Sequence, residues 1–152
     1  ESVFLGIRNG DRVTVIDIVE SRKDFKITSP IGTTLPLLAG AIGKIFLSRI
    51  GPKDLAAYLE TNPLNKFTSS TIIDPDLYIK EIETVRANGF ATDDEEYISG
   101  VRAVAAPVAR YGAYIPAIWV VGFKASMSDE KIVSIIDQTK LTADRISEKL
   151  AE

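Results

Sequence analysis

The acidic run at residues 93–96 (DDEE) is the densest group of side chains in the sequence that could do chemistry. Carboxylates can bind Mg²⁺ or Ca²⁺, or exchange protons as general acids and bases. The Asp spacing of a calcium loop is absent, however, and the helix dipole alone explains acids in a first helical turn. Thr92 and Glu95 also have the spacing of a capping box. We therefore predict a short capped helical turn here and no metal site.

A stretch of small residues, 40–44 (GAIGK), superficially resembles a phosphate-binding loop. A Walker motif would need Gly five positions before Gly43 and a hydroxyl residue after Lys44, where Leu38 and Ile45 stand instead. Two interpretations remain. The small residues permit close approach of another backbone, or the start of a helix receives an anion through its free amides. The spacing alone favours close packing.

The sequence contains neither His nor Cys, and this absence excludes many functions. Ser-His-Asp and Cys-His catalysis lose the base or the thiol, and no Gly-x-Ser-x-Gly elbow occurs. Disulfides and thiolate metal sites are also excluded. We expect no enzyme activity and no cofactor. The enzyme alternative would use Asp93 or Glu95 as acid or base, with Lys44 as an electrostatic partner.

The composition indicates one compact domain over residues 1–152, with 45% hydrophobic residues to form a core. A net charge of −3 with scattered basic residues argues against DNA binding by this segment. No apolar run approaches the roughly 18 residues that span a bilayer, and no secretory signal is present. We expect a cytoplasmic protein. The chain starts in strand-like sequence without Met, so we also expect that an upstream part is missing.

The first third of the sequence predicts strands followed by helices. Two β-rich runs, 3–8 and 12–19, are joined by Asn9-Gly10-Asp11, which is typical of a hairpin. A third short strand is predicted at 25–28. Helices are expected at 38–49 and from Pro52 to about residue 60.

The remaining sequence predicts a helix, a second hairpin and a last helix. Asp74 and Gly89 have the features of an N-cap and a C-terminal stop. Strands 101–108 and 114–123 follow, and Ser128 begins a helix with one apolar face. The fold class is therefore α+β around a mainly antiparallel sheet. Alternation puts Trp119 and Val121 on one face, either in the core or in the wall of a ligand cavity.

Three segments together resemble the effector domain of IclR-type transcription regulators over nearly the whole chain. They read GTTLPLLAGAIGKIFL from Gly32, GFATDDEEYISGVRAVAAPV from Gly89, and the strand from Ala117 to Gly122. The resemblance implies a GAF-like or profilin-like fold, in which a curved antiparallel sheet is flanked by helices. It also implies one pocket between the sheet and the loop-helix segment.

The resemblance further implies which residues contact a ligand. The amides of Ala41 and Ile42 correspond to those that receive a carboxylate, and the acidic pocket residue falls on Asp93. A thiol and two hydroxyls of small-acid sensors are replaced here by a more apolar set, namely Ala103, Trp119 and Val121. Leu38 stands where a His is common. Either the ligand is larger and apolar or aromatic, stacking on Trp119, or the Trp ring fills the cavity.

The implied function is sensing of a small organic acid or of an aromatic or apolar metabolite. Such an effector would control DNA binding allosterically, through a helix-turn-helix domain missing from the N-terminal side of this chain. The resemblance also implies a homodimer or tetramer as the working form. The main alternative is a ligand-independent oligomerisation domain, which a filled cavity would favour.

Overall fold

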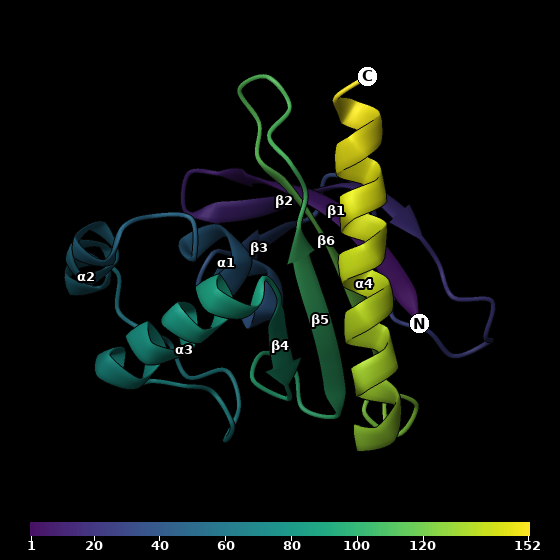
Figure 1. Ribbon diagram of the computed structural model, residues 1–152. Helices are drawn as coiled ribbons and strands as arrows, with labels where there is room; N and C mark the ends of the chain where they lie inside the picture. Colours follow the sequence, from purple (N-terminus) through teal and green to yellow (C-terminus); the bar gives the residue numbers. More distant parts are fainter.

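The computed structural model describes residues 1–152 and contains a curved six-stranded sheet (Figure 1). The strands are β1 (Ser2–Asn9), β2 (Arg12–Val19), β3 (Thr34–Pro36), β4 (Ala91–Asp94), β5 (Val101–Pro107) and β6 (Pro116–Phe123). Their order across the sheet is β3-β2-β1-β6-β5-β4, and every neighbouring pair is antiparallel. The predicted α+β class with a curved antiparallel sheet is confirmed.

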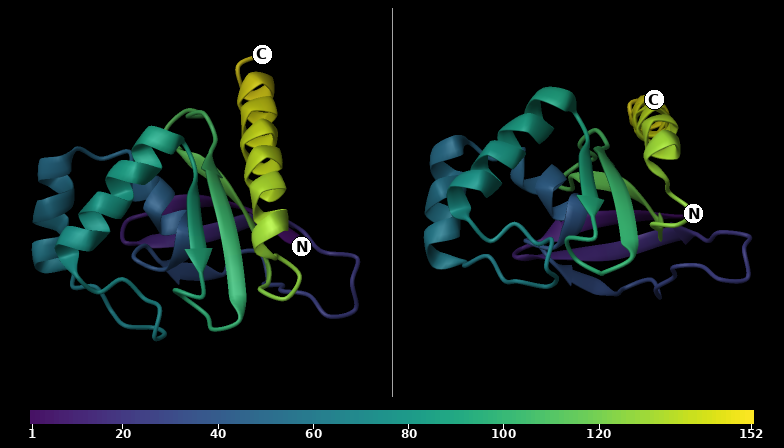
Figure 2. Two further views of the ribbon diagram at one scale, coloured as in Figure 1. Left: turned by 60° about the horizontal axis from the view of Figure 1, so that its bottom comes forward. Right: turned by 90° about the horizontal axis from the view of Figure 1, so that it is seen from below.

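Four helices flank the sheet: α1 (Gly40–Leu47), α2 (Pro52–Thr61), α3 (Pro75–Asn88) and α4 (Asp129–Leu150). Figure 2 shows α4 standing apart from α1, α2 and α3, which gather at the other side of the sheet. The main core lies between α1, α3 and the concave face, and a smaller apolar cluster lies under α4. None of the helices combines the length and apolar character needed to cross a bilayer.

Local sequence signals account for most element boundaries. Gly10 adopts φ 63° between β1 and β2, as the hairpin turn requires. At the start of α3, the Asp74 carboxylate accepts the Leu77 amide at 2.9 Å, and Gly89 ends the helix with φ 73°. Ser128 caps α4 as predicted, and the second hairpin is also present as β5 and β6.

The third strand was predicted in the wrong place. Residues 25–28 are irregular, and Phe25 is 87% exposed. Their composition favours a strand, but they pair with no neighbouring strand. The third strand is β3, which pairs with the start of β2 through Leu35 and Val13. Leu35 packs against the main core, and this tertiary contact outweighs the weak local strand preference of its sequence.

The predicted helical turn at 92–95 is also wrong, because this segment ends strand β4. Asp93 pairs across the sheet with Ala103 on β5, and the chain leaves the strand at Glu95 with φ 62°. The side chain that accepts an amide of the following turn is Asp93, which accepts the Glu96 amide, and not Thr92. Helix α1 begins at Gly40, two residues later than predicted, because Gly40 itself has φ 66°.

Candidate ligand-binding site

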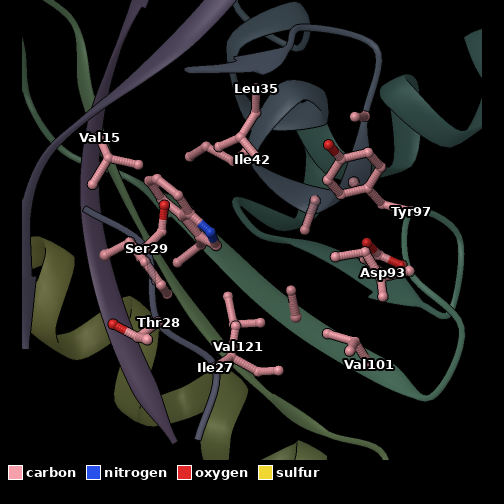
Figure 3. A pocket seen from close by; sticks show the side chains of 17 residues that line it. Val15, Ile27, Thr28, Ser29, Leu35, Ile42, Asp93, Tyr97, Val101 and Val121 are labelled. Carbon is pink, nitrogen blue, oxygen red and sulfur yellow. The ribbon is translucent and has the colours of Figure 1, made fainter. Parts of the chain in front are cut away.

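The main cavity of the molecule lies between the concave face of the sheet and the N-terminus of α1, and has a volume of about 240 Å³. Thirteen of its 17 lining residues are hydrophobic, so it suits a largely apolar ligand. An engineered apolar cavity of roughly 150 Å³ accommodates benzene, so this one has room for a substituted ring. Figure 3 shows Asp93 and Tyr97 on one side of the cavity, with Val15 and Ser29 opposite.

All six residues that the sequence singled out as ligand contacts line this one cavity. They come from four elements, namely Ala41 and Ile42 from α1, Asp93 from β4, Ala103 from β5, and Trp119 and Val121 from β6. Leu38 does not line it. The structure therefore brings the predicted set together, while their contact with a ligand stays a prediction.

Sequence reasoning missed two segments that complete the walls. Ile27, Thr28 and Ser29 come from the irregular segment before β3, and no local pattern could place this segment over the sheet. Tyr97 and Ile98 follow β4 in the same loop as the acidic run. Their closeness in sequence to Asp93 is a signal that could have identified them.

The first turn of α1 offers unused hydrogen-bond donors to the cavity. Its N-cap residue, Ala39, has no side chain that could cap the helix, and the amides of Ala41 and Ile42 donate to no protein acceptor. Both residues are nearly fully buried, and the cavity that they line is the open space beside them. Free amides and the positive end of the helix dipole together favour a bound anion.

Asp93 faces this helix start from β4 and is only 5% exposed. One carboxylate oxygen, Oδ1, accepts the Glu96 amide at 2.6 Å. The other, Oδ2, would lie 2.9 Å from a Cβ atom at Gly40, so a side chain there would displace the carboxylate. Burial raises the pKa of Asp93, opposed by the amides of Glu96 and Tyr97 and by the charge of Lys44.

The other three acids of the run point away from the cavity and are bound elsewhere. Asp94 forms a two-bond ion pair with Arg102, at 2.8 and 2.9 Å. Glu95 pairs with Lys124 and accepts the Gly100 amide. No group of three or more acidic side chains is arranged to hold a metal ion.

Lys44 lies behind the cavity, 1% exposed, and does not line it. Its Nζ atom is 2.9 Å from carboxylate oxygens of Glu81 and Glu96 and from the Thr92 carbonyl. These three bonds connect α1 to α3 and to β4. Because Lys44 is already paired, it offers no free charge to a reacting group beside Asp93.

Trp119 lines the cavity without filling it. Phe4 stacks on its indole with ring centroids 5.2 Å apart and an interplanar angle of 17°. A Cβ atom on Gly6 would lie 2.8 Å from Cζ3 of the ring, so only Gly leaves room for it. The benzo edge and one face of the indole are thus occupied by protein, while the cavity remains open beside the ring.

The fold is a curved antiparallel sheet with helices around a mostly apolar cavity. A helix start and one buried carboxylate face this cavity. Together, these features define a small-molecule-binding domain. Comparison with known proteins identifies its family. Residues 1–148 match the family described as "Bacterial transcriptional regulator IclR C-terminal", and the chain belongs to this family. It is an effector-binding domain of the IclR type.

Curated relatives include the HTH-type transcriptional regulator BhcR of Paracoccus denitrificans, 34% identical over 97% of this chain and 53% of the relative. The HTH-type transcriptional repressor AllR of Escherichia coli is 28% identical, over 99% of this chain and 56% of the relative. The chain thus spans about half the length of these relatives. Because they are regulators, the expectation that this domain is not an enzyme is confirmed.

Two solved structures show how similar the folds are. A transcriptional regulator from Rhodococcus sp. RHA1 has a TM-score of 0.91 and 30% identity, covering 99% of this chain and 62% of that one. The IclR of Thermotoga maritima has a TM-score of 0.89 and 31% identity, covering 100% and 62%.

Proposed function

We propose that residues 1–152 act as one domain that binds a small carboxylate with an apolar or aromatic body. One observation carries this proposal: the free amides of Ala41 and Ile42 and the buried Asp93 meet at one end of an otherwise apolar cavity. This end suits a carboxylate, and the rest of the cavity suits a hydrocarbon body. The open space beside Trp119 counts against the alternative of a ligand-independent domain.

In this proposal the ligand carboxylate accepts the Ala41 and Ile42 amides. Asp93 is close to the same helix start, and two charged carboxylates there would repel each other. The raised pKa of Asp93 reduces this conflict, because less free energy is needed for Asp93 to take up a proton as the ligand binds, and a protonated Asp93 would donate a hydrogen bond to the ligand carboxylate. Ala103 and Val121 form the apolar floor beside Trp119.

We further propose that the ligand acts through the elements that enclose it. Lys44 connects α1 to α3, and Arg102 connects β4 to the start of α4 through Asp94 and Asp129. A ligand that prefers one arrangement of α1 and β4 would therefore shift the positions of α3 and α4. In a longer cytoplasmic protein, this shift would control DNA binding by a helix-turn-helix domain. The relatives' designation as HTH-type regulators supports that role, and we propose a homodimer or tetramer as the working assembly.

The test is thermal unfolding of the chain with a panel of keto acids, aromatic carboxylates and apolar neutral compounds. A ligand at about 100 times its Kd adds roughly 2.7 kcal/mol, which raises the midpoint by about 5 to 10 °C. Asp93→Ala should abolish the shift, whereas Asp137→Ala, which removes an exposed carboxylate of α4, should retain it. No shift with any carboxylate would contradict the proposal.

A further inference from the structure

The indole N–H of Trp119 is a buried donor that has no partner in the protein. Trp119 is 5% exposed, and its Nε1 atom donates to no protein acceptor. Tyr78 Oη is the one side-chain atom that is both unpartnered and completely shut off from solvent space. The unpartnered Nε1 of Trp119 therefore reaches accessible space, and for a residue so deeply buried that space is the cavity it lines.

The indole is also held in one position. Phe4 stacks on one face of the indole. The benzo edge lies so close to Gly6 that a Cβ atom on this residue would be 2.8 Å from Cζ3 and 3.1 Å from Cη2. The ring therefore cannot tilt toward β1 to find another acceptor. A rigid donor in a desolvated wall discriminates strongly, because a ligand without an acceptor leaves the donor unpaired.

We propose that Trp119 determines specificity by donating its indole N–H to an oxygen in the body of the ligand. This inference rests on the proposed function and narrows the ligand class. The ligand is a carboxylate whose apolar body carries an ether or carbonyl oxygen. Its carboxylate lies at the start of α1, and its second oxygen lies at Trp119. The indole thus acts as a hydrogen-bond donor, while Phe4 covers one of its two faces.

Matched pairs of ligands test this inference. The 2-, 3- and 4-methoxybenzoates and the corresponding ethylbenzoates have nearly the same shape and differ in one oxygen acceptor. Their Kd values would be measured by calorimetry with the unaltered chain. At the ring position that faces Nε1, the methoxy acid should bind about three- to tenfold more tightly than its ethyl twin.

Two variants assign the preference to a donor. Trp119→Phe keeps an aromatic ring and removes the N–H, so the ratio of the two Kd values should fall to about one. Tyr111→Phe likewise keeps an aromatic ring and removes a donor, but at an exposed residue outside the cavity, so it should keep the ratio. Circular dichroism would check that both variants fold. Trp119 is the only tryptophan, so its fluorescence gives a second readout in the unaltered chain, where the methoxy acid should shift the emission to longer wavelength than the ethyl acid does.

The outcomes separate this inference from the proposed function. If both members of every pair bind with equal affinity, the role of Trp119 is overturned and the effector site stands. A preference that persists in Trp119→Phe would also overturn it, because another donor would be responsible. If none of the six acids binds, the ligand class is overturned, and the broader panel then decides whether the site binds carboxylates at all.

Discussion

At the scale of single residues, two opposing effects act on the pKa of Asp93. Folding removes its carboxylate from water, which raises its pKa, and the Glu96 amide bond only partly compensates. A carboxyl group whose pKa is higher in the folded than in the unfolded state destabilises the fold while it is charged. This destabilisation is absent at low pH, appears as the pH rises above the ordinary pKa of Asp, and is complete above the raised pKa.

Asp93→Asn should remove this pH dependence. Asn has the same shape, and its Oδ1 can still accept the Glu96 amide. The free energy of unfolding of the unaltered chain should therefore rise relative to Asp93→Asn as the pH falls from 7 to about 4, the ordinary pKa of Asp, as measured by urea unfolding. Asp137→Asn, on the exposed face of α4, controls for the loss of one charge. An identical difference at both pH values would contradict the burial argument.

At the scale of elements, α1 is fixed on two sides. Its Gly43 touches the backbone of the preceding loop so closely that a Cβ atom would lie 1.7 Å from the Leu37 carbonyl oxygen. On the other side, Lys44 connects the helix to α3 and β4. The small residues of 40–44 thus show the close packing that their spacing favoured, and reception of an anion at the helix start stays a prediction. Gly43 allows close packing, and Gly40 leaves space for Asp93 beside the helix start.

Gly43→Ala should be strongly destabilising although Ala favours helices. The gain in helix propensity is roughly 1 kcal/mol, whereas the collision with a backbone oxygen cannot be relieved by a side-chain movement. We expect a net loss of about 3 kcal/mol in urea unfolding. Gly51→Ala is the matched control, because its backbone has φ −66° and a Cβ would meet nothing closer than 3.9 Å. Equal stability of the two variants would refute the packing role.

Lys44→Met should destabilise the domain by about 3 kcal/mol at neutral pH. Removal of the buried cation leaves the carboxylates of Glu81 and Glu96 partly desolvated and unpaired. Adding Glu96→Gln should recover part of the loss, since the pKa of Glu96 is already raised by burial. Chemical unfolding of the two single variants and the double variant would measure the coupling. Strictly additive losses would contradict a direct interaction.

The elements set by local signals were predictable, and those set by distant contacts were not. The Asn9-Gly10 turn and the Asp74 cap act within a few residues, so composition and spacing suffice. Strand β3 exists because Leu35 packs into the core, which no local pattern indicates. The spacing of Thr92 and Glu95 wrongly predicted a helical turn, because a capping-box spacing can also occur where a strand ends, as it does here at the end of β4. The family resemblance predicted six of the cavity residues, but Ser29 and Tyr97 could be identified as wall residues only from the structure.

At the scale of the whole molecule, the two faces of the sheet have separate roles. The concave face contributes Ala103, Trp119 and Val121 to the cavity, whereas the opposite face packs against α4 through Ile118 and Ala106. The proposed ligand-linked movement of α4 acts through Asp129, at the first turn of the helix. Stability under the C-terminal half of α4 and affinity in the cavity should therefore vary independently, because substitutions in these two places share no partner.

Ile146→Ala tests this separation. Ile146 is half-buried against the cluster under α4, so its truncation should cost about 1 to 2 kcal/mol in unfolding experiments, less than for a fully buried residue. The Kd of a carboxylate found in the panel should change less than twofold. Val133→Ala, on the exposed side of α4, should leave both quantities unchanged. A large loss of affinity in Ile146→Ala would show that the two faces are coupled.

The alternation at the end of β4 has a consequence for changes in chain length. Asp93 faces the cavity, while its neighbour Asp94 faces Arg102 on the other side of the sheet. Inserting or deleting one residue just before this point would exchange the two carboxylates, since strand side chains alternate with a period of two. The ion pair and the proposed ligand contact would then be lost together, although both carboxylates are still present. This segment should therefore tolerate no insertion or deletion of a single residue.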